Sequence, residues 1–136
     1  MRIVAQSGDM TDTGNVFGVM RNARDGQDSR DLRESAPFGS RYLTGLFQNT
    51  AFEETSWGYT SDVRSAARAG SAWDFEVRSG QVPGPISLSM QGDLPSGIAG
   101  VRLENVETGE TFMFSTGAEY SFAPVGAVHR FRLVLE

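Results

Sequence analysis

The sequence predicts an all-β fold, an antiparallel sandwich of two sheets, and three observations support this. Residues 73–78 alternate apolar and polar side chains, with Trp73, Phe75 and Val77 on one side, as in a strand with one buried face. Similar segments recur roughly every 8–12 residues with turn residues between them, the spacing of a sandwich or barrel. No long segment has the i, i+3, i+4, i+7 apolar spacing of a helix.

The first half of the chain is less regular than the second. Strands are expected at residues 2–6, 41–49 and 58–65, which are apolar or aromatic runs bounded by polar and turn residues. Residues 64–70 suit one helical turn that ends at a glycine. Residues 8–40 are polar and rich in Gly, Asp and Asn, and are expected to be a long polar loop region. Such a connection inside a compact domain is often functional or ordered by a metal.

The second half gives a continuous series of strands. Pro and Gly bound the strand at residues 86–91, and a turn at residues 107–110 separates two apolar runs, which indicates a hairpin. Two further strands close the chain. The side chains expected to face the core are Trp73, Phe75, Val77, Ile86, Leu88, Val101, Leu103, Phe112, Phe114, Tyr120, Phe122, Phe131 and Leu133.

Composition excludes several functions. A chain of 136 residues with 39% hydrophobic content is the size of one globular domain, and its net charge of −5 disfavours nucleic acid as a partner. Cysteine is absent, which removes disulfides, thiolate nucleophiles and sulfur-ligated zinc. All twelve basic residues are Arg, so chemistry that needs a lysine amine is excluded. No apolar run approaches the ~18 residues of a membrane span.

The order of motifs resembles a group of β-sandwich modules near the C-termini of large secreted bacterial proteins, often beside a type IX-style sorting segment. The similarity runs from about Asp12 to Leu135, and its most specific parts are "WDFEVRSG" and the pairing of "YSF" with "RFRLVL". The resemblance implies an extracellular, non-catalytic, Ig-like accessory domain. With the strand spacing above, it gives about eight or nine strands in a single domain over residues 1–136. It assigns no ligand.

The stretch "NARDGQDSRDLRES" places four acidic residues three apart, and two interpretations stay open. It does not match the EF-hand pattern, but Asp25, Asp28 and Asp31 could bind a structural calcium ion irregularly. Against this, four Arg balance the four acids over residues 21–34, whereas a calcium site needs uncompensated carboxylates. The favoured interpretation is a solvated loop with weak Arg–carboxylate pairs.

A second candidate site is the cluster "FEETSWGYTSD". Sugar-binding modules stack flat rings on pyranose faces and accept hydroxyl hydrogen bonds with nearby carboxylates, so Trp57, Tyr59, Phe52 and Glu54 are candidate glycan-binding residues. The alternative is structural: Trp57 covers the end of the sandwich, or Tyr59 points into it, with a partner for its polar atom.

Catalysis is not expected. Glu53 and Glu54 are adjacent in the chain, which does not establish the two opposed acids of a glycosidase. His129 is the only histidine and is expected to be a partly exposed residue at the start of the last strand. The predicted function is a non-catalytic extracellular or cell-surface module that spaces or presents a larger protein beside neighbouring domains. The alternatives are a carbohydrate-binding module, with polysaccharide as partner, and less favoured, a hydrolase. No nucleic acid and no membrane span are expected.

Overall fold

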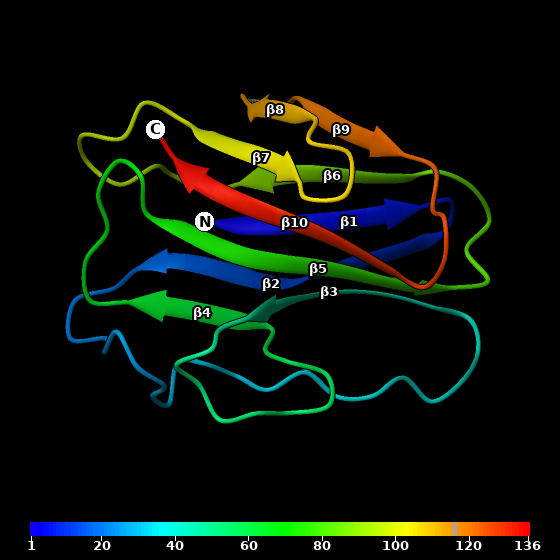
Figure 1. Ribbon diagram of the computed structural model, residues 1–136, viewed down its shortest axis with the longest axis horizontal. Coiled ribbons are helices and arrows are strands. Elements are labelled where there is room, and N and C mark those ends of the chain that lie inside the picture. Colours follow the sequence, from blue (N-terminus) through cyan, green and yellow to red (C-terminus); the bar gives the residue numbers. More distant parts are fainter. Residues whose placement is uncertain (116) are drawn as a thin grey trace.

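The computed structural model describes residues 1–115 and 117–136, which form two β-sheets packed face to face (Figure 1). This confirms the predicted all-β sandwich. The described residues contain no helix and ten strands. The strands are β1 (Arg2–Ser7), β2 (Met10–Val19), β3 (Tyr42–Gln48), β4 (Ser61–Arg64), β5 (Ala72–Gly80), β6 (Ile86–Gln91), β7 (Val101–Asn105), β8 (Thr111–Phe114), β9 (Glu119–Phe122) and β10 (Val128–Leu135).

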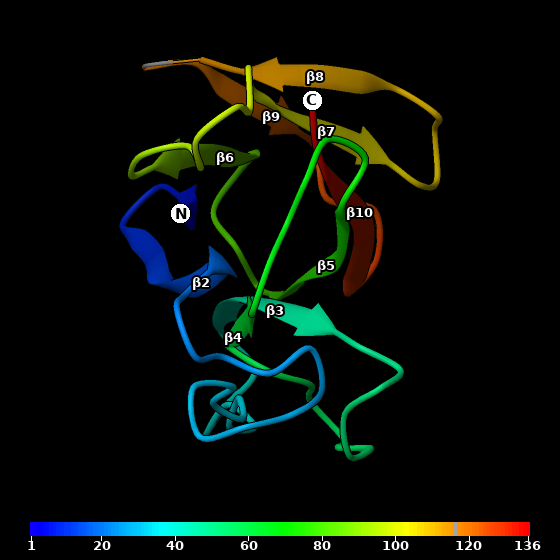
Figure 2. The same cartoon turned by 90° about the vertical axis from the view of Figure 1, so that its left-hand side faces the viewer.

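Each sheet has five strands. The first sheet has the order β4-β2-β1-β6-β9 and the second β3-β5-β10-β7-β8. Figure 2 looks at one end of the sandwich, where the strands of the two sheets face each other across the core. The neighbouring strands are antiparallel except β2 and β4, which run parallel. A parallel pair needs a long crossover, and the chain between β2 and β4 includes β3 of the other sheet.

The core lies between the sheets and is rich in aromatic side chains. The predicted inward residues all belong to it or pack against it, although Phe112 and Phe122 are only partly buried. Phe17 of the first sheet meets Trp73 of the second edge to face, with ring centroids 5.4 Å apart. The alternation seen in the sequence therefore gives the buried face of each later strand, because side chains on a strand point to opposite faces in turn.

The expectation of a loop over residues 8–40 is wrong for its first part. Residues 10–19 form β2, a strand that the sequence did not predict and that brings the number of strands among the described residues to ten. The sequence hides this strand because most of its outward positions are polar and Asn15, an inward one, is polar too and fully buried. Antiparallel pairing with β1 makes this segment a strand, although its side-chain pattern does not predict one. Residues 20–41 form the remaining long connection.

The helical turn expected at residues 64–70 is also absent. Arg64 is the last residue of β4, and the chain then crosses to the second sheet without regular structure. The N–H of Gly70 donates to the carbonyl of Leu135 at 2.7 Å. This short stretch is therefore fixed by a hydrogen bond to β10 rather than by hydrogen bonds within a helical turn.

Strand pairing defines two ends of the sandwich. Met1 and Glu136 lie at the same end (Figure 1): the Met1 ammonium donates to the Phe17 carbonyl at 3.0 Å, and the Glu136 N–H donates to Gly100. We call this the terminal end. The turn after β1 and the starts of β3, β6 and β10 lie at the opposite end, which we call the far end. The chain thus returns to the end from which it started.

Candidate functional site

The stretch "NARDGQDSRDLRES", residues 22–35, lies along the outer edge of the first sheet, and we call it the acidic segment. The last strand of this sheet, β4, pairs with β2 on one side only, and residues 20–34 run along the other side. The Thr60 N–H donates to the Leu32 carbonyl at 2.8 Å, and the Leu32 N–H donates to the Ser61 hydroxyl at 2.8 Å. The segment therefore covers an edge that would otherwise expose hydrogen-bonding groups.

Two of the predicted calcium ligands accept the outward N–H groups of this edge. Asp31 Oδ1 accepts from the Val63 N–H at 3.0 Å. Asp25 Oδ1 accepts from the Ser65 N–H at 3.1 Å and from the Ser65 hydroxyl at 2.6 Å. These carboxylates take the place that a neighbouring strand's carbonyl groups would have.

The third, Asp28, organises the segment itself. Its carboxylate accepts from the N–H groups of Arg30 and Arg24 at 2.7 and 2.9 Å and pairs with the Arg30 guanidinium at 3.1 Å. The Asp28 N–H donates in turn to Asp31 Oδ2 at 2.8 Å. Within the described residues, no three acidic or histidine side chains are grouped so that they could hold a metal ion. The structure uses all three carboxylates as acceptors for N–H groups.

The surroundings of these acids shift their pKa values in opposite directions. Hydrogen bonds from Ser65 lower the pKa of Asp25, and those from the Arg30 and Arg24 N–H groups lower the pKa of Asp28. Burial raises the pKa of Asp31, although hydrogen bonds from Val63 and Asp28 partly oppose this. The difference follows from burial, because desolvation disfavours the charged form of a carboxyl group.

Behind the covered edge lies an ion pair between a buried carboxylate and a partly buried guanidinium, which the sequence analysis did not predict. Asp62, 1% exposed, accepts from Arg64 Nε and Nη2 at 3.1 and 3.0 Å and from Asn49 Nδ2 at 2.9 Å. The Arg64 guanidinium lies over the Trp73 ring, 4.5 Å from its centroid, and the indole N–H donates to the Asp62 carbonyl. The available signal was an acid and a base two apart on one strand, which places both on one face.

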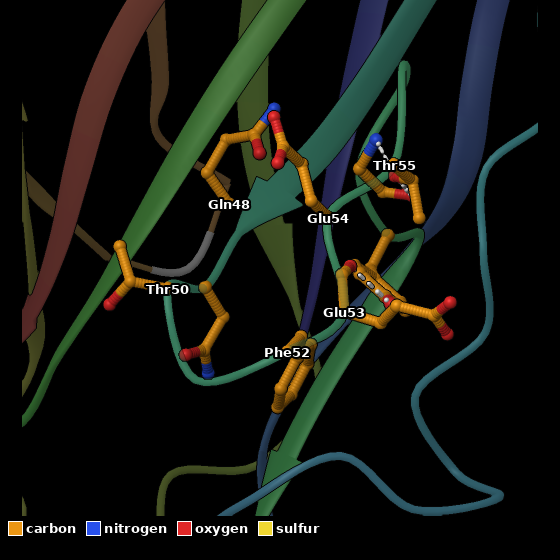
Figure 3. A pocket seen from close by; sticks show the side chains of 9 residues that line it. Gln48, Thr50, Phe52, Glu53, Glu54 and Thr55 are labelled. Atoms are coloured by element: carbon orange, nitrogen blue, oxygen red, sulfur yellow. Dashed lines mark hydrogen bonds between the residues drawn. The ribbon is translucent and has the colours of Figure 1, made fainter.

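A polar cleft of about 300 Å³ lies in the loop between β3 and β4 (Figure 3). Three of the four predicted glycan-binding residues line it: Phe52, Glu54 and Tyr59. The other lining residues were not among the predicted glycan-binding residues. They come from the last position of β3 and the loop that follows it: Gln48, Asn49, Thr50, Glu53, Thr55 and Gly58. A volume of this size is at the lower limit for small-molecule sites.

The aromatic rings of the cleft are not free platforms, which corrects the expectation for Phe52 and Tyr59. They are 8% and 2% exposed, and their rings pack edge to face with centroids 4.9 Å apart. The Tyr59 hydroxyl donates to the Glu53 carbonyl at 2.9 Å. The structural alternative describes Tyr59 correctly: it is buried, and its hydroxyl has a partner.

Trp57 lies outside the cleft, on the outer face of the second sheet. The Arg78 guanidinium is 4.9 Å from the centroid of its ring, and Tyr42 meets it edge to face at 5.8 Å. Its side chain is half-buried. Trp57 therefore covers a sheet face rather than the end of the sandwich, and one of its own faces is occupied by Arg78.

The two adjacent glutamates have different surroundings. Figure 3 shows Glu54 projecting to the same side of the cleft as Gln48, whereas the Glu53 carboxylate points the other way. Glu53 pairs with Arg33 of the acidic segment. The two carboxylates thus diverge, and Glu54 is the acid that a ligand in the cleft would meet.

His129 corrects another expectation, because it is buried rather than partly exposed. It is 4% exposed and packs against Phe122, with ring centroids 5.0 Å apart. Its Nδ1 lies 3.6 Å from Glu107 Oε2, and its buried Nε2 has no hydrogen-bond partner among the described residues. The inward alternation of β10 begins two residues earlier than expected, at His129 rather than at Phe131.

Comparison of the chain with protein-family models, with curated proteins and with solved structures gave no match. The resemblance to secreted β-sandwich modules therefore stays a prediction. Among residues 1–115 and 117–136, no helix has the length and apolar character needed to cross a bilayer.

Proposed function

We propose that the chain is a non-catalytic accessory module of a larger secreted or cell-surface protein, where it presents part of its surface beside neighbouring domains. One observation carries the proposal: the carboxylates of the most chemistry-like segment are used structurally. Asp25, Asp28 and Asp31 accept hydrogen bonds from N–H groups of this chain. Acids held in this way stabilise a scaffold, whereas a catalytic acid has to reach a substrate.

The positions of the ends support presentation over spacing. A spacer in a linear series of domains suits ends at opposite sides, whereas Met1 and Glu136 both lie at the terminal end (Figure 1). A module attached there would direct its far end away from its neighbours. The loops of the far end are then the surface that it would present, since binding residues are often on loops held by a rigid scaffold.

Two measurements test the proposal. An antibody against the chain should label intact cells of the source organism, and brief protease treatment of those cells should remove the label. Labelling only after the cells are broken would contradict an extracellular role. The purified chain should also leave polysaccharides, peptides and ester substrates unchanged. Turnover that Glu54→Gln abolishes would instead identify a hydrolase.

The cleft favours carbohydrate binding as the second candidate function. Gln48, Glu54 and Thr50 offer amide, carboxylate and hydroxyl groups around one hollow, which suits the hydroxyl groups of a sugar. Because Phe52 and Tyr59 are buried, they would contact a sugar only with their edges. Any stacking on an open ring face would come from Trp57, which lies outside the cleft.

A polysaccharide panel distinguishes the candidates. If the cleft binds sugar, Glu54→Gln should weaken retention on one polysaccharide, while Glu119→Gln, at an exposed position of β9, leaves it unchanged. Fluorescence quenching by acrylamide in the Trp73→Phe variant reports on Trp57 alone, and a ligand that stacks on the ring should reduce quenching. Retention that is absent, or equal in wild type and both variants, would exclude this candidate.

A further inference from the structure

Three connections at the far end carry the two most exposed large apolar side chains of the described residues. These connections are residues 36–40, 81–85 and 123–127, with sequences "APFGS", "QVPGP" and "APVGA"; we call them together the tip. Phe38 has a relative exposure of 108% and Val125 of 84%. Each occupies the third position of an Ala-Pro-x-Gly sequence, a pattern typical of bends. Both side chains project clear of the protein surface.

The three connections form one surface. The Ser79 N–H donates to the Ala127 carbonyl at 3.0 Å, which joins the third connection to the end of β5. Gly80 leaves no room for a Cβ because the Ser40 carbonyl would overlap it, which places the first connection beside the second. The turn after β1 closes the group, since a Cβ on Gly8 would lie 2.6 Å from Pro83.

The tip has no charged residue, although 21% of the chain is charged. Next to the tip, Asp9 and Arg41 neutralise each other in an ion pair at 2.6 Å. Ser40 and Gln81 supply its polar side chains. The tip is therefore uncharged and largely apolar on a chain with a net charge of −5.

We propose that the tip is a membrane-contacting surface that inserts Phe38 and Val125 into the interface of an uncharged, zwitterionic bilayer. The proposal goes beyond the accessory role and does not depend on it. Apolar loop residues that project singly gain free energy when they enter the boundary between headgroups and acyl chains. A net negative chain without a basic patch gains nothing from anionic lipids, so the preferred surface is neutral.

The size and shape of the tip favour a bilayer over a protein partner. A stable protein interface uses roughly 20–30 residues on each side, and the tip has fewer. A second copy that met it tip to tip would place projecting side chains against projecting side chains. A fluid bilayer accepts projections without shape complementarity. Since the termini lie at the other end, attachment to neighbouring domains leaves the tip free.

The contact is expected to be weak and reversible, because even one myristoyl chain gives only marginal membrane binding. A sensitive local probe is therefore needed, and the absence of cysteine allows one. At Gly39 in the tip and at Gly26 in the acidic segment, nothing lies within 4 Å of an added Cβ, and neither glycine has a positive φ. Gly39→Cys and Gly26→Cys are thus matched attachment sites for an environment-sensitive fluorophore.

The experiment titrates both labelled proteins with vesicles of phosphatidylcholine, alone or mixed with phosphatidylglycerol, up to millimolar lipid. The label at position 39 should brighten, shift to the blue and be quenched by brominated acyl chains, while the label at position 26 stays unchanged. Phe38→Ser combined with Val125→Ser should lower the partition coefficient at least tenfold. Leu32→Ser removes an apolar side chain that is 58% exposed outside the tip, and should have no effect.

Several results would overturn the proposal. These are no response at position 39, equal responses at both positions, or binding that requires the anionic lipid. The label at position 39 could instead respond to protein concentration in the absence of lipid. If sedimentation then also detected a dimer, the tip would be an interface between two copies of the chain. Circular dichroism of every variant separates loss of membrane contact from loss of fold.

Discussion

Asp31 Oδ1 accepts a hydrogen bond from the Val63 N–H at 3.0 Å, and this bond attaches the acidic segment to the free edge of β4. Asp31 is 5% exposed, so the contact is largely shielded from water. Exposed edge strands pair with other chains and promote aggregation. The row of acids therefore has a structural explanation, since it closes the edge of the first sheet with side-chain acceptors.

We expect Asp31→Ala to lower the free energy of unfolding by about 1–3 kcal/mol, the cost of a buried donor left without a partner. The substitution leaves the N–H groups of both Val63 and Asp28 unpaired. Urea denaturation followed by circular dichroism measures the change. Asp93→Ala, at an exposed carboxylate in the connection after β6, serves as the control and should stay within about 0.5 kcal/mol of wild type. Equal effects of the two substitutions would contradict the edge-covering role.

The acids of the segment should titrate in a defined order. Hydrogen bonding lowers the pKa of Asp25 and Asp28 below the ordinary 3.8, and burial raises that of Asp31 above it. Carbon-13 NMR of the side-chain carboxyl groups should therefore give Asp31 the highest midpoint of the three. A midpoint of Asp31 at or below those of the other two would contradict the burial of Asp31 and the hydrogen bonding of Asp25 and Asp28.

The same shifts give the sign of the stability change with pH. The pKa of Asp28 is lower in the folded state, so its contribution is complete above pH 3.8 and is lost as the pH falls through the lowered value. The raised pKa of Asp31 acts in the opposite sense: its contribution is present below pH 3.8 and is lost as the pH rises through the raised value. Asp28→Asn should thus be less stable than wild type at pH 6, and the difference should shrink below pH 3.8. A constant difference would contradict this.

Removal of calcium should leave the unfolding temperature unchanged. The three candidate ligands already accept hydrogen bonds from N–H groups, and within the described residues no three acids are grouped so that they could hold a metal ion. A ligand at 100 times its Kd adds about 2.7 kcal/mol of stability and shifts Tm by several degrees. Thermal unfolding with excess EDTA and with millimolar calcium tests this. A clear rise in calcium that Asp28→Asn abolishes would show that the segment rearranges around an ion.

The central aromatic residues should dominate stability. Phe75 and Phe131 are each 1% exposed and face each other in the register of β5 and β10. Replacing either with Ala should cost about 3–5 kcal/mol, since the cavity cannot fully collapse. Phe38→Ala is the matched control, because Phe38 loses no packing and should change stability by less than about 0.5 kcal/mol. Urea melts of all three variants give the comparison, and a small loss at both core positions would contradict the core assignment.

The core of the second half could be predicted from the sequence because alternation is a local property. Trp73, Phe75 and Val77 share one face of their strand whatever its position in the sheet, and this face is buried. The same reasoning failed for β2, whose inward position Asn15 is polar, and for His129. In both cases neighbouring strands, rather than side-chain polarity, decide burial.

The sequence could predict which residues belong to the candidate sites, but not how their side chains are arranged. The sequence indicated Phe52, Glu54 and Tyr59 together, and the fold places them around one cleft. It could not show that two of the rings are buried, or that Trp57 lies under Arg78. These depend on how the loop after β3 folds back over the sheet, which involves contacts distant in sequence.

By itself, the sequence determined the all-β class and the inward faces of its later strands, and excluded cysteine and lysine chemistry, because composition and a period of two are readable along one chain. Tertiary structure alone decided what the acids do, which strands lie at the edges, and that "APFGS" and "APVGA" lie at the same end of the sandwich. The physical reason is that hydrogen-bond partners and surface patches form between segments far apart in sequence. Asp31 and Val63 are 32 residues apart, and only the packing of the sheets brings them into contact.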